Sequence, residues 1–153
     1  METDSVSAPL AYQKILAPFD GSPGSSKALR RALLVAKDCG AEVTVLSVDE
    51  NLPRYAPAVG EVEEDEGLRE AHLAHLREEA LGLAEEYGIA VRIETKIGHA
   101  AQTIVQVAQQ EGFHLVAIGH SGHSGRSGLW GTLLGSTTAR VVDQATCDVL
   151  VVR

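Results

Sequence analysis

A glycine-rich segment that directly follows a short apolar stretch contains the residues best suited to binding a ligand. The apolar stretch covers residues 115–118, and glycines recur after it at positions 119, 122, 125, 128, 131 and 135, with His, Ser and Arg between several of them. Glycine allows backbone conformations and close approaches that other residues exclude. A loop between a buried strand and a helix N-terminus offers free N–H groups and the positive end of the helix dipole to an anion. The pattern therefore favours phosphate or nucleotide binding.

Two further polar groups lie where they could take part in the same chemistry. Ser136 and Thr137 stand at the start of an expected helix, where hydroxyl and N–H groups can bind phosphate oxygens. Asp20 follows the first apolar stretch in the run Asp20-Gly21-Ser22-Pro23. Its carboxylate either forms an Asx turn or accepts hydrogen bonds from a nucleoside, and the sequence leaves both open.

The histidines suggest metal binding or catalysis only weakly. His72 and His75 share a helix face, and His120 and His123 flank the glycine-rich segment, but neither pair has a matched third ligand. No Walker A motif, dinucleotide fingerprint, nucleophile elbow or paired-carboxylate site is present. We therefore expect no metal site and assign no catalytic residue, so that binding is favoured over catalysis.

Strand-like and helix-like stretches alternate along the chain. Apolar or β-branched stretches predict strands at 14–19, 42–48, 89–96, 114–118 and 149–152, and helical spacing predicts helices between them. The helices are expected to begin at Pro23, near the acidic run at 61–66, at Gly98 and at Gly135. Gly40, Gly88 and Gly112 each stand between a helix and the next strand, which is typical of βαβ crossovers in a parallel sheet.

The carboxyl ends of the predicted strands should meet at one edge of the sheet. Ligands of such α/β sheets bind outside these ends, where the strand order reverses. Asp20, Val48 and the glycine-rich segment all fall at strand ends. One pocket could therefore use all three.

Composition limits the class of protein. The chain has 153 residues, 44% hydrophobic and 4% aromatic, and a formal net charge of −8. The charge argues against a general nucleic-acid or anionic-membrane binder. The two cysteines form no metal motif, and no apolar run approaches the roughly 18 residues of a membrane span. We expect a cytoplasmic protein with a flexible tail at residues 1–12, which lacks signal-peptide features, and a single domain at 13–153.

From Lys14 to Arg153 the chain resembles the universal stress protein family. The opening stretch from Ile15 to Ser22 is similar to the family's first strand and Asp-Gly-Ser turn. The stretch from Val45 to Asp49 is similar to the end of the family's second strand. ATP-binding members carry the motif Gly-x2-Gly-x9-Gly-Ser/Thr, which Gly122, Gly125, Gly135 and Ser136 fit. The stretch from Cys147 to Val152 also looks typical of the family.

The resemblance implies a Rossmann-like, open twisted sheet of five parallel strands with four helices on both faces. It implies a cytoplasmic, ATP-binding stress-response regulator or binding module, with or without Mg²⁺ or Mn²⁺, and a homodimer paired through the strand from Val149 to Val152. Adenosine would contact Pro18, Asp20 and Val48. Phosphates and ribose would contact a set of small residues, Gly119 or Gly122, Gly125, Gly135, Ser136 and Thr137.

Two departures from the family pattern keep other functions open. His114 stands where the family usually has an acidic residue, and the triplet His-Ser-Gly occurs twice, so either Gly119 or Gly122 is the first motif glycine. One alternative is a slow ATPase that uses Asp20 with His120 or His123. The other alternative is a dimeric interaction module that has lost nucleotide binding.

Overall fold

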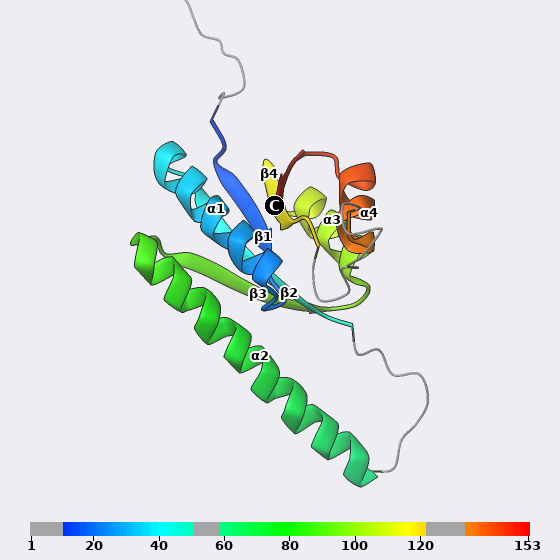
Figure 1. Ribbon diagram of the computed structural model, residues 1–153. Helices are drawn as coiled ribbons and strands as arrows, with labels where there is room; N and C mark the ends of the chain where they lie inside the picture. Colours follow the sequence, from blue (N-terminus) through cyan, green and yellow to red (C-terminus); the bar gives the residue numbers. More distant parts are fainter. Residues whose placement is uncertain (1–10, 51–58, 122–133) are drawn as a thin grey trace, which may run out of the picture.

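The computed structural model describes residues 11–50, 59–121 and 134–153, except for the side chains of residues 59–65. Strands and helices alternate through this part of the chain (Figure 1). The elements are β1 (Lys14–Pro18), α1 (Pro23–Cys39), β2 (Glu42–Asp49), α2 (Val59–Tyr87), β3 (Val91–Ile97), α3 (Ala100–Gln110), β4 (Leu115–Gly119), α4 (Ser136–Gln144) and β5 (Asp148–Val152).

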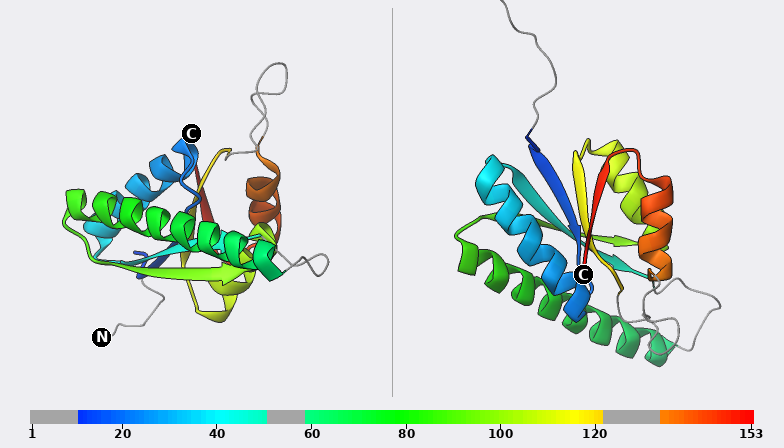
Figure 2. Two further views of the ribbon diagram at one scale, coloured as in Figure 1. Left: turned by 90° about the horizontal axis from the view of Figure 1, so that it is seen from below. Right: turned by 45° about the horizontal axis from the view of Figure 1, so that its top comes forward.

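The sheet is parallel throughout, with strand order β3-β2-β1-β4-β5. Helices α1 and α2 cover one face, and α3 and α4 cover the other (Figures 1 and 2). This arrangement confirms the predicted α/β fold. From β1 the chain builds the sheet toward β3, and then returns to build β4 and β5 on the other side. The order therefore reverses between β1 and β4, where sheets of this kind bind ligands.

Alternating side chains of the central strands fill two separate cores. Ile15 and Ala17 of β1 pack with the buried side chains of α1 and α2, and Leu16 packs with those of α3 and α4. These strand residues are fully buried. Because both faces are covered, the strands read as continuous apolar stretches in the sequence.

The predicted start of α1 and the glycines after three helices are confirmed, whereas α3 begins at Ala100 and not at Gly98. Ser22 caps α1, its side chain accepting a hydrogen bond from the Ser25 N–H, and Pro23 occupies the first turn. Gly40, Gly88 and Gly112 adopt φ of 71°, 68° and 70°, the left-handed conformation that glycine accepts most easily.

The predicted start of β3 at residue 89 is wrong by two residues. The Ile89 N–H donates to the Ala84 carbonyl at 3.1 Å, and the Gly88 N–H donates to Glu85 at 3.0 Å. These bonds complete the C-terminus of α2, so pairing with β2 begins only at Val91. Helix α2 begins at Val59, which places the acidic run at 61–66 in its first turns.

The expected tail at residues 1–12 falls mostly outside the described residues. Tyr12 packs beside the core under α1 and donates its hydroxyl to the Asp148 carboxylate at 2.8 Å. At the same edge of the sheet, His114 Nδ1 accepts from the Gln13 and Lys14 N–H groups, both at 3.2 Å. No helix of residues 11–50, 59–121 and 134–153 is long and apolar enough to cross a membrane.

Candidate functional site

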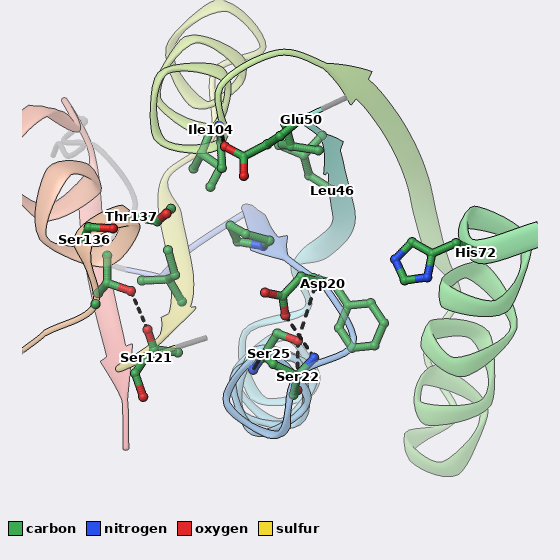
Figure 3. A pocket seen from close by; sticks show the side chains of 18 residues that line it. Asp20, Ser22, Ser25, Leu46, Glu50, His72, Ile104, Ser121, Ser136 and Thr137 are labelled. Carbon is green, nitrogen blue, oxygen red and sulfur yellow. Dashed lines mark hydrogen bonds between the residues drawn. The ribbon is translucent and has the colours of Figure 1, made fainter. Parts of the chain in front are cut away.

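A cavity of about 340 Å³ opens at the carboxyl end of the sheet, where the strand order reverses. The ends of β1, β2 and β4 and the starts of α1, α3 and α4 line it (Figure 3). Most of the predicted binding residues meet there, namely Pro18, Asp20, Val48, Gly119, Gly135, Ser136 and Thr137. The other two predicted residues, Gly122 and Gly125, lie outside the described part of the chain.

Helices α1, α3 and α4 begin at this cavity, and two of them carry a side-chain cap. The Ser22 hydroxyl caps α1. The Glu50 carboxylate accepts the Ala100 N–H at 2.9 Å and so caps α3 from another segment. Gly135 precedes α4, and among the described residues no side chain caps that helix. These N–H groups and the helix dipole make the start of α4 the described part of the cavity best suited to an anion.

Hydrogen bonds fix the start of α4 against β4. The Thr138 hydroxyl donates to the Gly119 carbonyl at 2.7 Å, and the Gly135 N–H donates to the His120 carbonyl at 3.0 Å. The His120 N–H in turn donates to Val152 of β5 at 2.8 Å. The N-terminus of α4 is therefore held in place before any ligand binds, which reduces the entropic cost of binding.

Asp20 forms the Asx turn that its sequence context suggested. Its Oδ1 accepts the Ser22 N–H at 2.9 Å, and its own N–H donates to the Ser25 hydroxyl at 3.3 Å. The residue is nevertheless exposed and lines the cavity (Figure 3). The turn holds the carboxylate at the cavity, so the two readings of Asp20 are compatible.

Apolar side chains form another part of the cavity wall. Leu46 and Val48 come from β2, Ile104 from α3 and Ile118 from β4. Leu46, Ile104 and Ile118 are buried in the core beneath α3 and α4. A flat, partly apolar group such as a nucleobase can pack on such a surface, with its polar edge toward the surrounding hydrogen-bonding groups.

Gly119 lines the cavity, but contact with α1 explains why it has no side chain. A Cβ at Gly119 would lie 2.7 Å from the backbone of Gly24, and a Cβ at Gly24 would lie 2.2 Å from the Ser121 carbonyl oxygen. Real Cβ atoms do not approach backbone so closely. The first turn of α1 therefore packs directly against the end of β4.

Several lining residues were missed by the sequence interpretation. Glu50, Ser121 and Ile104 line the cavity, and so does His72 from α2. The sequence interpretation gave His72 no part in the binding site. His120, beside the glycine-rich segment, is not among the lining residues, and His123 lies outside the described residues. One signal was available: His72 stands four residues before Leu76 of the apolar stripe, next to the packed face of its helix.

Metal ligation is not apparent among the described residues, which contain no group of three or more His, Cys, Asp or Glu placed to hold an ion. The cavity itself contains Asp20, Glu50 and His72. The Glu50 carboxylate is engaged with α3. The described lining therefore offers hydrogen-bonding groups to a ligand.

Comparison with known proteins assigns the chain to a family. The model of the universal stress protein family matches residues 11–153. The chain belongs to the universal stress protein family. It is 34% identical over 143 residues to a universal stress protein of Methanocaldococcus jannaschii, a match that covers 93% of this chain and 82% of the relative.

Solved structures of universal stress proteins share the fold. UspA from Lactobacillus plantarum superposes with a TM-score of 0.79 at 29% identity, covering 95% of this chain and all (100%) of that one. A universal stress protein in complex with cAMP superposes with a TM-score of 0.73 at 27% identity, covering 94% of this chain and 98% of that one. The five-stranded parallel sheet described above is thus the fold of the family.

Proposed function

We propose that the cavity binds ATP, and that the protein is a nucleotide-dependent binding module of the stress response. The observation that carries the proposal is the N-terminus of α4, which no described side chain caps, placed in one cavity with an apolar wall and the Asp20 carboxylate. Phosphates would bind at Gly135, Ser136 and Thr137, and the nucleoside would lie toward Asp20 and Val48. The cAMP complex of a related protein supports an adenine nucleotide.

The predicted phosphate motif supports ATP in particular. Gly135 and Ser136 at its end lie at the start of α4, and its first two glycines, Gly122 and Gly125, fall outside the described residues. Additional backbone N–H groups from that segment would bind the outer phosphates, with or without Mg²⁺ or Mn²⁺. A triphosphate should therefore bind more tightly than a monophosphate.

Binding is favoured over hydrolysis by the position of the candidate bases. His120, one candidate partner of Asp20, is not among the lining residues, and its backbone is engaged with β5 and α4. The other candidate, His123, lies outside the described residues. Asp20 itself is part of the Asx turn. We therefore propose that nucleotide occupancy, rather than turnover, changes the surface that the protein presents to partners.

A homodimer in the cytoplasm completes the proposal. Among the described strands, β5 pairs with β4 alone, and its Val149, Leu150 and Val151 are only half-buried. A second copy could add to this edge. The free thiols of Cys39 and Cys147 are compatible with a reducing compartment.

Nucleotide extraction and equilibrium dialysis test the proposal. Denaturing the purified protein should release a nucleotide that absorbs at about 260 nm and co-elutes with an adenine nucleotide standard. Dialysis of nucleotide-free protein against labelled ATP and Mg²⁺ should show saturable binding of one ATP per chain. Absence of binding at millimolar ATP would refute the ATP proposal and favour an interaction module without nucleotide.

A further inference from the structure

His72 is the cavity residue contributed by the long helix α2 (Figure 3). The imidazole extends from α2 toward the side on which Asp20 lies, whereas Ser136 and Thr137 lie across the cavity (Figure 3). A ligand with its phosphates at the start of α4 would therefore bring its other end toward His72.

Contacts on both sides of His72 fix this part of α2 against the sheet. Three residues earlier, Arg69 Nε lies 3.1 Å from the Asp49 carboxylate, which is nearly buried at the end of β2. Four residues later, Leu76 is buried and packs so closely on Gly21 that a Cβ there would lie 2.8 Å from Leu76 Cδ2. Residues spaced by three and four share one helix face, so these contacts direct His72 to the cavity.

The chemistry of the neighbouring groups leaves a recognition role for this side chain. The Glu50 carboxylate caps α3, and Asp20 can only accept hydrogen bonds when ionised. The two nitrogens of an imidazole point to different sides of its ring, so His72 can form one hydrogen bond with the edge of a base. Adenine and guanine present opposite donor and acceptor groups at positions 1 and 6, so one hydrogen bond of fixed direction distinguishes them. The apolar surface of Leu46, Val48 and Ile104 would support the faces of that base.

We propose that His72 contacts the base of the bound nucleotide and sets the preference of the cavity for adenine over guanine. The inference rests on the proposed nucleotide function and assigns one residue of that site. It differs from the interpretation of His72 as a solvated surface histidine, because it predicts an effect on base selectivity.

His75 offers a matched control on the same helix. It is exposed, its Nε2 lies 3.2 Å from Glu79 Oε1 within α2, and it does not line the cavity. Replacing either histidine with alanine removes an exposed imidazole from a helix, so both variants should fold. Circular dichroism and thermal melting establish that they do.

The experiment compares dissociation constants for ATP, GTP and tripolyphosphate in wild type, His72→Ala and His75→Ala. Loss of one hydrogen bond to the base should weaken ATP binding by about three- to ten-fold in His72→Ala and lower the ATP-to-GTP preference by a similar factor. Tripolyphosphate binding should not change, and His75→Ala should match wild type for all three ligands.

Proton NMR tests directly whether the bound nucleotide contacts His72. The histidine C2–H signal that is missing from the His72→Ala spectrum should shift when ATP is added to wild type, and the signal missing from His75→Ala should not. A wild type that binds ATP, with an unchanged ATP-to-GTP ratio in His72→Ala or an unshifted His72 signal, overturns this inference alone. A wild type that binds no nucleotide overturns both this inference and the proposed function.

Discussion

Asp20 combines a structural and a ligand-binding task at one position. Asp20→Asn keeps an oxygen that can accept the Ser22 N–H, which Oδ1 accepts at 2.9 Å, but removes the charge. We expect the melting temperature to stay nearly constant and ATP affinity to fall about ten-fold, since charged acceptors form the stronger hydrogen bonds. Asp20→Ala should lower both the melting temperature and the ATP affinity. Calorimetry and thermal melts would measure this, and wild-type affinity in Asp20→Asn would remove the carboxylate from nucleoside binding.

Gly24 and Gly119 are required for packing between α1 and β4. Gly24→Ala would place a Cβ 2.2 Å from the Ser121 carbonyl oxygen, so the backbone at the cavity must move. We expect a loss of about 1–3 kcal/mol in the free energy of unfolding. Gly82→Ala, in α2 with nothing within 4 Å of the added Cβ, is the matched control and should stabilise by up to about 1 kcal/mol. Equal stability of the two variants in urea would contradict the packing account.

Glu94 gives the stability a pH dependence. Burial raises the pKa of Glu94, and the neighbouring Glu111 carboxyl raises it further. A raised folded-state pKa contributes stability below the unfolded value, and that contribution is lost as pH rises through the folded pKa. Glu94→Gln should therefore raise the melting temperature at about pH 7, by an amount that shrinks toward about pH 4. Glu85→Gln, at an exposed position, should show neither effect. A difference in melting temperature between Glu94→Gln and wild type that does not change with pH would contradict the raised pKa of Glu94.

At the scale of single elements, the start of α4 gives a prediction that separates stability from ligand binding. Gly135 has φ −59° and ψ 153°, a conformation open to any residue. Gly135→Asp would cap α4 with its own carboxylate, adding up to about 1 kcal/mol of stability. The same carboxylate would compete with phosphate, so triphosphate affinity should fall at least ten-fold. Stability and affinity should thus change in opposite directions in melts and calorimetry. A Gly135→Asp protein that binds ATP normally would place the phosphates elsewhere.

Much at the element level could be predicted because the signals are local. Ser22-Pro23 indicated the start of α1, and glycines after three helices indicated parallel crossovers. The cavity residues Pro18, Val48 and Ser136 followed from strand and helix ends together with the family motif. Each of these predictions depended on one continuous stretch of sequence, the longest being the motif from Gly122 to Ser136.

The remaining site residues depend on contacts between distant segments. Glu50 caps α3 only because β2 ends beside Ala100, fifty residues later in the chain. His72 reaches the cavity because the Arg69–Asp49 ion pair and the Leu76–Gly21 contact fix α2 across the sheet. Helical spacing alone shows which residues share a face, but not what that face packs against.

For the whole molecule, the two edges of the sheet differ in character. The edge strand β3 carries alternating charges at Arg92, Glu94 and Lys96, which discourage pairing with another chain. The other edge strand, β5, is formed by Asp148–Val152, with apolar and half-buried residues at 149–151. We expect a dimer through β5 at micromolar concentration in sedimentation equilibrium. A monomer under those conditions would contradict the assembly that we propose.

The central claim is that one cavity holds an adenine nucleotide with its phosphates at the start of α4. Titration calorimetry of nucleotide-free protein with ATP and Mg²⁺ tests it most directly, with wild type and Gly135→Asp in parallel. We predict one site per chain with sub-millimolar affinity in wild type, and an affinity at least ten-fold weaker in the folded variant. Absence of binding to wild type at millimolar ATP, or equal binding to both proteins, would contradict the claim.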